Sequence, residues 1–377
     1  MSEARINRIS NEKGDGGPSL SGITTFSGLN YFVPPKGTTA ERPSDCPPGS
    51  IRFNTDSAHL EYWDGLQWLE FEATNDELGG GTGSNTGLGT RGLFMGGGPS
   101  VTNTIDYITI STLGNAQNFG DLTQARWTGG SAASSTRAVT AGGETPSGIV
   151  NTIDFGVFAS TANFSDFGDL IAGMGQGVGG ASSSTRGVFL GGGTPSKSNA
   201  IQYITIASQG NSVDYGDLSY AADAQPEGTC SSSVRGIAAG GNPGPSKINN
   251  ISYITISTLG NGQDFGDLTL VRGTPGTVSN ATRGIFAGGE SSTNIIDFIT
   301  IATTGNAQDF GDLQTTSFSR AGVSSPTRGC FGGGANPTLI NVIEYVSILS
   351  AGNAIDFGDL TRTNRGMTSC SNGHGGL

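Results

Sequence analysis

TRGLFMGGGPSVTNTIDYITISTLGNAQNFGDL, residues 90–122, is the first copy of a unit that recurs along the chain. The unit ends with the tetrad Phe/Tyr-Gly-Asp-Leu, which appears six times at intervals of 48, 48, 50, 45 and 47 residues. The aspartates of the six tetrads are Asp121, Asp169, Asp217, Asp267, Asp312 and Asp359. A second marker, the triplet Thr/Val-Arg-Gly/Ala, recurs in each unit, at Arg91, Arg137, Arg186, Arg235, Arg283 and Arg328. A Gly-Gly pair follows the triplet, and an asparagine precedes each tetrad, at Asn115, Asn163, Asn211, Asn261, Asn306 and Asn353. Markers that repeat in one order at one period indicate six copies of a single structural unit.

Each unit reads as four strands. In residues 125–170 these are ARWTGGSAASS, with small side chains suited to a crowded axis, then TRAVTAGG, NTIDFGVFAS and NFSDFGDL. In the first copy, Ile105 and Tyr107 point to one face of the third strand, while Ile108 and Ile110 point to the other, because strand side chains alternate. Both faces must therefore be covered, as they are when blades stack around a ring. We expect an all-β chain with a six-bladed β-propeller of four-stranded blades.

Two features resemble kelch repeats over residues 88–377. They are the Gly-Gly pair after the second strand and an arginine that opens the first strand in several units, at Arg126, Arg272, Arg320 and Arg365. The tryptophan that kelch repeats carry in their last strand is Phe or Tyr here. The first unit lacks a first strand and begins with its second. The C-terminal residues of the chain have the position and pattern of a first strand. We therefore predict that residues near 362–372 pair with residues near 91–97, which closes the ring and hides both sheet edges.

The N-terminal part differs in pattern from the repeats. We predict an attachment module over 1–78 with a β-meander at 51–72, a Gly-rich linker at 79–89, and the propeller over 90–377. The meander consists of IRFNT, LEYW and LQWLEF, and Asp64-Gly65 is a strong hairpin signal between the last two. Three strands bury too little to be comfortably stable, so we expect the meander to pack on the propeller or on another chain.

This part of the chain carries a second resemblance. The stretches ARINRISNEKGDGGPSLSGITTFSGLNYFVPP and GTTAERPSDCPPGSIRFNTDSAHLEYWDGLQW resemble virion structural and tail-fibre-like proteins of tailed bacteriophages, those of contractile-tailed phages of cyanobacteria in particular. The resemblance implies a virion protein of the tail or another exposed structure, assembled in the host cytoplasm and oligomeric in the particle. It implies that the N-terminal module binds other virion proteins, with candidate contacts at Arg5, Ile6, Tyr31, Phe32, Trp63 and Trp68.

Composition limits the partners and the chemistry. The formal net charge is −12, and the chain has only four lysines, so no basic patch for nucleic acid is expected. No run of about 18 apolar residues and no apolar N-terminal core occur, so neither membrane insertion nor a signal peptide is expected. The four cysteines contain no CxxC pair and are interpreted as small buried residues rather than zinc or redox ligands.

The sequence contains none of the active-site motifs that propeller enzymes use. Only two histidines occur, His59 and His374, in different predicted domains, which excludes a His-rich metal site and disfavours a Ser-His-Asp triad. Sialidase-type Ser-x-Asp-x-Gly-x-Thr-Trp turns do not occur, and the six repeat arginines are expected to bond to neighbouring strand ends. The six tetrad aspartates could bind Ca²⁺, but acceptance of backbone N–H bonds in the following turn is favoured. We predict no catalytic residue, no cofactor and no metal, and hence no enzyme.

Ligand binding is expected on one face of the ring. The loops joining strands two to three and four to one emerge together there and vary in length and chemistry, whereas the loops of the other face are monotonous. Aromatic, amide and carboxylate groups on this face suit carbohydrate. The alternative is that most of them are ordinary solvated loop residues. The candidate contacts are Trp127, Lys197, Asn199, Tyr220, Asp223, Gln225, Lys247, Asn249, Asn250 and Phe318.

Three functions remain open at this point. The first is recognition of the host surface by the propeller, with a glycan or a protein as the ligand. The second is a structural spacer or decoration packed against other virion proteins. The third, a hydrolase of surface polysaccharide, has no motif in its favour.

Overall fold

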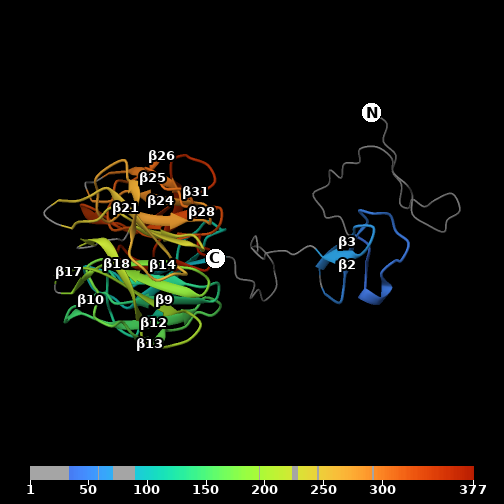
Figure 1. The fold of residues 1–377 in the computed structure, drawn as a ribbon, viewed down its shortest axis with the longest axis horizontal. Coiled ribbons are helices and arrows are strands. Elements are labelled where there is room, and N and C mark those ends of the chain that lie inside the picture. Colours follow the sequence, from blue (N-terminus) through green and yellow to red (C-terminus); the bar gives the residue numbers. More distant parts are fainter. Residues whose placement is uncertain are drawn as a thin grey trace. The chain divides into compact units, whose positions relative to one another are not determined.

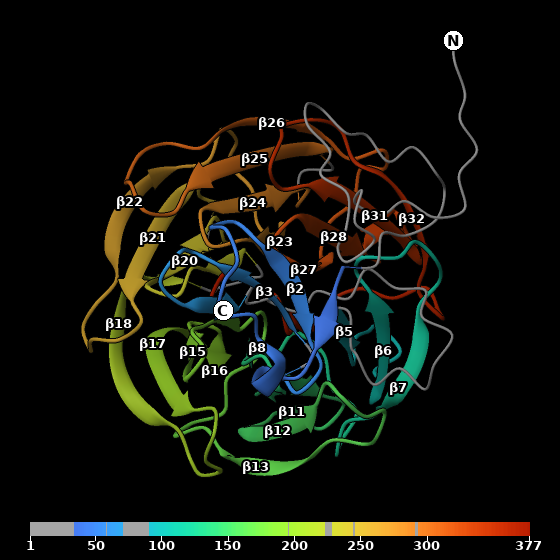
Figure 2. The ribbon, with the colours of Figure 1, turned by 90° about the vertical axis from the view of Figure 1, so that its right-hand side faces the viewer.

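The computed structural model describes residues 34–57, 59–70, 90–194, 196–222, 228–243, 246–290 and 293–377. The chain divides into two compact units, Met1–Thr74 and Asn75–Leu377. Strands are the main elements of both units (Figure 1), and the sheets of the larger unit surround a common centre (Figure 2). The described residues contain no α-helix, and hence none that could cross a membrane. The predicted linker at 79–89 and the candidate contacts Arg5, Ile6, Tyr31, Phe32, Asp223 and Gln225 lie outside the described residues.

The first unit is a four-stranded sheet in the order β1 (Lys36–Gly37), β2 (Ile51–Asn54), β3 (His59–Trp63) and β4 (Trp68–Glu70), with a short 3-10 helix η1 (Thr39–Glu41). β2, β3 and β4 are the predicted meander, and β1 adds a parallel edge strand. The predicted hairpin is confirmed, because β3 pairs with β4 and the Asp64 carboxylate accepts the Leu66 N–H at 2.7 Å.

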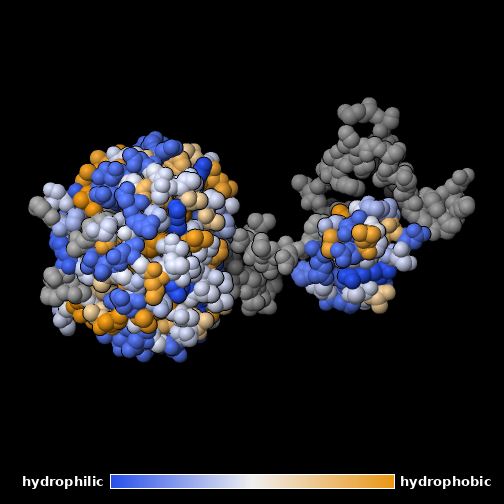
Figure 3. Space-filling view, viewed as in Figure 1, coloured by the Kyte–Doolittle hydropathy of each residue, from blue (hydrophilic) through white to orange (hydrophobic). Residues whose placement is uncertain are grey.

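One face of this sheet is polar and buried, and the other is apolar and open. Glu61, fully buried, accepts hydrogen bonds from Arg42 at 3.0 Å and from Asn54 at 3.2 Å. On the opposite face Ile51 and Leu60 are exposed, and apolar side chains gather on the visible surface of this unit (Figure 3). The predicted contacts Trp63 and Trp68 pack on each other, with ring centroids 5.7 Å apart.

The second unit contains six antiparallel sheets among the described residues, five of four strands and one of five. Sheet I comprises β33 (Thr368–Ser371), β5 (Arg91–Met95), β6 (Thr104–Thr109) and β7 (Gln117–Asp121). Sheet II comprises β8 (Gly130–Ala133), β9 (Arg137–Ala141), β12 (Thr152–Val157) and β13 (Ser165–Asp169). Sheet III comprises β14 (Gly179–Ser182), β15 (Arg186–Leu190), β17 (Ser196–Thr205) and β18 (Val213–Ala222), with β16 (Gly193–Thr194) beside β17.

The remaining three sheets repeat this order. Sheet IV comprises β19 (Thr229–Ser231), β20 (Arg235–Ala239), β21 (Asn250–Thr255) and β22 (Gln263–Asp267). Sheet V comprises β23 (Gly276–Ser279), β24 (Arg283–Ala287), β25 (Ile295–Thr300) and β26 (Gln308–Asp312). Sheet VI comprises β27 (Ala321–Ser324), β28 (Arg328–Gly332), β31 (Val342–Ser347) and β32 (Ile355–Asp359). Two small hairpins, β10 (Glu144–Thr145) with β11 (Gly148–Ile149) and β29 (Ala335–Asn336) with β30 (Thr338–Leu339), lie in loops between second and third strands.

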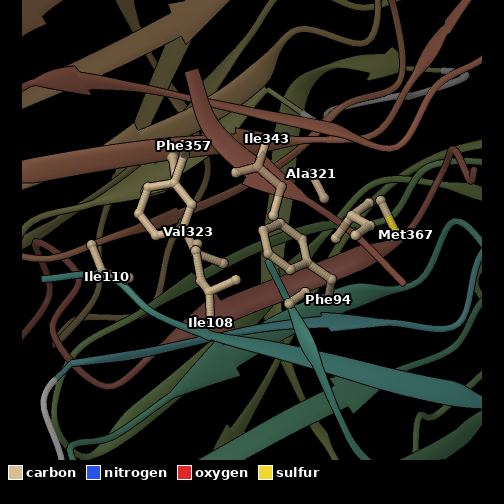
Figure 4. Close-up of a cluster of buried hydrophobic side chains, with 11 residues drawn as sticks. Phe94, Ile108, Ile110, Ala321, Val323, Ile343, Phe357 and Met367 are labelled. Carbon is tan, nitrogen blue, oxygen red and sulfur yellow. The ribbon is translucent and has the colours of Figure 1, made fainter. Parts of the chain in front are cut away.

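A separate apolar cluster fills each contact between consecutive sheets. Ile105 and Tyr107 pack against sheet II, whereas Ile108 and Ile110 pack against sheet VI, as the alternation of the strand predicts. Figure 4 shows the cluster between sheets VI and I, where Phe94 and Ile108 meet Phe357 and Val323. The contacts thus run from each sheet to the next and from the sixth back to the first.

The predicted pairing of the chain's end with the first unit is confirmed. Thr368 pairs with Met95 and Ser371 pairs with Gly92, so that β33 supplies the missing first strand of sheet I. The strand covers the edge that β5 would otherwise expose, and an uncovered edge is a site of aberrant pairing.

The tetrad joins neighbouring sheets through its backbone. In the last copy, the Asp359 N–H donates to the Oδ1 of Asn115 at 3.0 Å, and the same bond recurs in all six copies. The predicted role of the six aspartate carboxylates, accepting N–H bonds of the following turn, is not found among the described residues. The backbone approach leaves no room at the preceding glycine, since a Cβ on Gly358 would come within 2.5 Å of the Gly114 oxygen.

The six repeat arginines do bond to neighbouring strand ends, as predicted. Each stacks on an aromatic ring of its own sheet and donates to a backbone carbonyl of the next. Arg91 reaches Phe158 in sheet II, and Arg328 of sheet VI reaches the Ile110 oxygen of sheet I at 2.7 Å. The repeated arginine is therefore a structural link between sheets.

Candidate ligand site at the mouth of the axial channel

The first strands of all six sheets line a narrow axial channel with a volume of about 60 Å³. These strands carry a ring of serines. The Oγ of Ser231 donates to the Ser182 oxygen at 2.9 Å, and Ser279, Ser324 and Ser371 repeat the bond from sheet to sheet. The ring satisfies backbone groups on the inner edges of these strands, which have no further strand to pair with.

One position of the serine ring is an alanine, and a histidine from the C-terminus fills the gap. Ala133 has no hydroxyl, and the Nε2 of His374 lies 3.1 Å from the Ala133 oxygen and 3.3 Å from the Ser182 hydroxyl. The Gly376 N–H donates to Nδ1, so the neutral ring carries its proton on Nε2. Burial lowers the pKa of His374 from 6.5 to about 4, a shift opposed by its bond to Ala133. The C-terminal residues therefore close this end of the channel.

At the other end, backbone hydrogen bonds between the described loops that precede the first strands form the throat. Thr128, Gln176, Thr274 and Ser319 have positive φ values between 49° and 56°, and Gly366 has 60°. The Thr128 N–H donates to Gly366 and the Gly366 N–H to Ser319, at 2.8 and 3.1 Å. Non-glycine residues in this conformation are strained by about 1–3 kcal/mol each, and such strain concentrates at functional sites.

Above the throat the channel widens into a hollow of about 270 Å³, which we call the mouth. The side chains and backbone of ten residues line it: Trp127, Thr128, Glu144, Gln176, Asn242, Glu290, Phe318, Ser319, Arg365 and Gly366. These residues come from the loops between strands four and one and between strands two and three. The mouth therefore lies on the face that the sequence predicts for ligand binding.

One wall of the mouth is aromatic and cationic. Phe318, Arg365 and Trp127 occupy equivalent loop positions in the consecutive sheets VI, I and II, as their backbone bridges to Ala335, Gly98 and Glu144 show. The Arg365 guanidinium carbon lies 5.5 Å from the centre of the Phe318 ring. The Trp127 ring packs on backbone, since a Cβ on Gly98 would come 2.7 Å from its Cε3. Rigid backbone therefore holds this wall in place.

Arg365 differs from Arg126, Arg272 and Arg320, the three other arginines that the sequence places at the start of a first strand. Arg126, Arg272 and Arg320 are buried and pair with Asp154, Asp297 and Glu344 at 2.9, 2.8 and 3.1 Å. Burial lowers the pKa of each of these guanidinium groups. The Arg365 side chain has no hydrogen bond or ion pair within the described part of the chain, and its buried Nε is unpartnered. Arg365 therefore lacks the structural ion pair that the other three arginines make.

The opposite wall is polar. It consists of Gln176 from sheet III, Asn242 from sheet IV and Glu290 from sheet V. In sheets III and V the loop positions equivalent to Trp127 are glycines, Gly175 and Gly273. Two lysines stand at its margin. The Lys197 Nζ donates to the Asn242 oxygen at 3.1 Å, and the Lys247 Nζ lies 3.4 Å from the Glu290 carboxylate. The mouth thus has two chemically different sides.

The structure brings two of the ten predicted ligand contacts, Trp127 and Phe318, into the mouth, and it places Lys197 and Lys247 at the margin. Asn199, Asn249 and Asn250 lie at third strands, and Asn249 has a backbone role, since its carbonyl accepts the Leu268 N–H at 2.7 Å. Tyr220 lies in β18, and its side chain is outside what the structure describes. The sequence missed Arg365, Glu144, Gln176, Asn242 and Glu290, although the register of the six loops, aligned on the Gly-Gly pair, could have placed them around one axis.

The described residues offer no group of three or more His, Cys, Asp or Glu side chains that could hold a metal ion. Cys230, Cys330 and Cys370 are buried, as predicted, and burial raises the pKa of each thiol. Cys46 is partly exposed.

The chain was compared with known families and proteins. No protein-family model matches it, and no curated protein matches it at a significant level.

Proposed function

We propose that this chain is a virion structural protein whose second unit is a closed, six-bladed, kelch-like propeller that recognises a host-surface glycan without catalysis. The closed cycle of six apolar clusters, the β33–β5 pairing and the throat bonds support the propeller. The resemblance of residues 4–72 to tail-fibre-like proteins supports the virion assignment and attachment through the N-terminal module.

The mouth is the observation that carries the recognition proposal. Sugar sites combine an aromatic surface for ring stacking with charged and amide groups that bond to hydroxyls. The mouth provides Trp127 and Phe318 for the first role, and Glu144, Gln176 and Asn242 for the second. Its volume of about 270 Å³ suits one or two sugar rings.

The first described residue of the second unit lies at the closed end of the channel, where Thr90 meets Gly373. The mouth lies at the opposite end of the channel.

Binding of the full-length chain to a glycan array and to host cells tests recognition. Trp127→Ala and Phe318→Ala are expected to lower affinity at least tenfold, because each removes a stacking surface. Leu113→Ala is the matched control, since Leu113 is 60% exposed beside the turn preceding β7, away from the mouth. Equal binding by all four proteins would overturn the mouth as the site. Release of reducing sugar would overturn the non-catalytic part.

A reconstruction of the virion tests the attachment. We expect residues 1–72 to contact other virion proteins while the mouth faces outward. A mouth covered by virion proteins would favour the spacer alternative instead.

A further inference from the structure

We propose that the mouth takes an acidic sugar, a uronic or nonulosonic acid residue whose carboxylate pairs with Arg365 while its ring stacks on Trp127. The inference rests on the proposed function and names the ligand class of the same site.

Arg365 is a cation without an anion. Its guanidinium lies over the Phe318 ring at the mouth, and it has no carboxylate partner among the described residues. The other arginines of its group are neutralised by buried acids. A guanidinium presents a planar fork of donors that matches a carboxylate, and such charged pairs are roughly twice as strong as neutral hydrogen bonds. A carboxylate on the ligand would supply the missing partner.

Among the described residues, Arg365 is the cation at the mouth that an anionic ligand can pair with. Lys247 already lies 3.4 Å from the Glu290 carboxylate, and Lys197 donates to the Asn242 oxygen. The Lys247–Glu290 pair leaves Glu144 without an ionic partner within the described residues, and its oxygens are suited to accept sugar hydroxyls.

The remaining features call for a hydroxylated ring rather than a simple anion. Thr128 is 8% exposed, lines the mouth, and its Oγ1 has no hydrogen-bond partner in the described residues. Buried hydroxyls are normally paired, so this hydroxyl can bond to a ligand if its side chain turns toward the mouth. An inorganic anion would use Arg365 alone and leave the Trp127 face unused.

The experiment measures binding of the full-length chain by calorimetry. The probes are oligosaccharides of galacturonic, glucuronic and mannuronic acid, sialyllactose, the carboxyl-reduced form of each uronic oligomer, and lactose. We expect at least one acidic probe to bind at least tenfold tighter than its neutral counterpart. Arg365→Met should abolish that difference. Arg362→Met is the control, because Arg362 lies on the same face but bonds to Thr102 and does not line the mouth.

The outcomes separate the two proposals. Equal binding of acidic and reduced probes, unaffected by Arg365→Met, would overturn the acidic-sugar inference and leave glycan recognition standing. A chain that binds none of the probes, acidic or neutral, would count against both. Thermal melting of each variant shows whether it is folded, and Arg365→Lys should restore part of the preference if charge is what matters.

Discussion

The Nε2 of His374 lies 3.1 Å from the carbonyl oxygen of Ala133, on the inner edge of β8. The histidine stands where a hydroxyl completes the serine ring in the other sheets, and its Nδ1 accepts the Gly376 N–H. A protonated imidazole would carry an N–H on Nδ1 as well, and this N–H would point at the Gly376 N–H with no acceptor between them. The closed end of the channel therefore requires the neutral imidazole.

Acid should destabilise the fold through this residue. The pKa of His374 is about 4 when folded and 6.5 when unfolded. Below pH 6.5 the unfolded chain therefore binds a proton that the folded chain does not. The free energy of unfolding falls as pH drops from 6.5 to about 4, by at most about 3 kcal/mol, because channel water would solvate the charged ring.

Urea unfolding of the wild type and His374→Gln at pH 7.5 and 4.5 measures this loss. Glutamine can still donate to Ala133 but does not titrate. The free energy of unfolding should therefore fall less between pH 7.5 and 4.5 in His374→Gln than in the wild type. Equal losses in the two proteins would show that other groups carry the pH dependence.

Removing one hydroxyl of the serine ring should weaken the fold. Ser279 donates to the Ser231 oxygen at 2.9 Å and accepts the Ser231 N–H at 3.4 Å. Ser279→Ala leaves both backbone groups unpaired in a buried setting, at a cost of about 1–3 kcal/mol. Chemical denaturation measures the change. A variant as stable as the wild type would mean that channel water replaces the hydroxyl.

The tetrad glycine should not tolerate a side chain. Gly358 has φ of 146°, and its added Cβ would lie 2.5 Å from the Gly114 oxygen across the contact of sheets VI and I. We expect Gly358→Ala to lower stability by about 2 kcal/mol or more. Gly352→Ala is the matched control, because Gly352 has nothing within 4 Å of an added Cβ and no positive φ. Similar melting temperatures for the two variants would contradict the predicted crowding.

Deleting residues 368–377 should open the second unit. The deletion removes β33, exposes the edge of β5 and removes Cys370 from the cluster between sheets I and II. We expect aggregation or loss of cooperative unfolding, because an unpaired inner edge and apolar surface become exposed. Size-exclusion chromatography and thermal melting measure the result. A stable monomer with an unchanged melting temperature would contradict the closing role of β33.

The sequence by itself determined the repeat, the four strands of each unit and the pairing of the C-terminal strand with the first unit. Strand alternation assigned Ile105 and Ile108 to opposite faces, because that information is local. The repeated arginines were also predictable, since six equivalent positions imply six equivalent surroundings.

Only the tertiary structure decided where the copies differ. Arg126 and Arg365 look alike in sequence, yet Arg126 meets Asp154 whereas Arg365 faces the mouth, because their loop positions differ by one residue relative to the first strand. His374 lies near the end of the chain, but it completes a ring whose other members are up to 241 residues away. The mouth and the closed end both lie on the axis where six loops or strands meet. Local pattern fixes each strand, but the identity of a neighbour across that axis depends on how all six sheets pack.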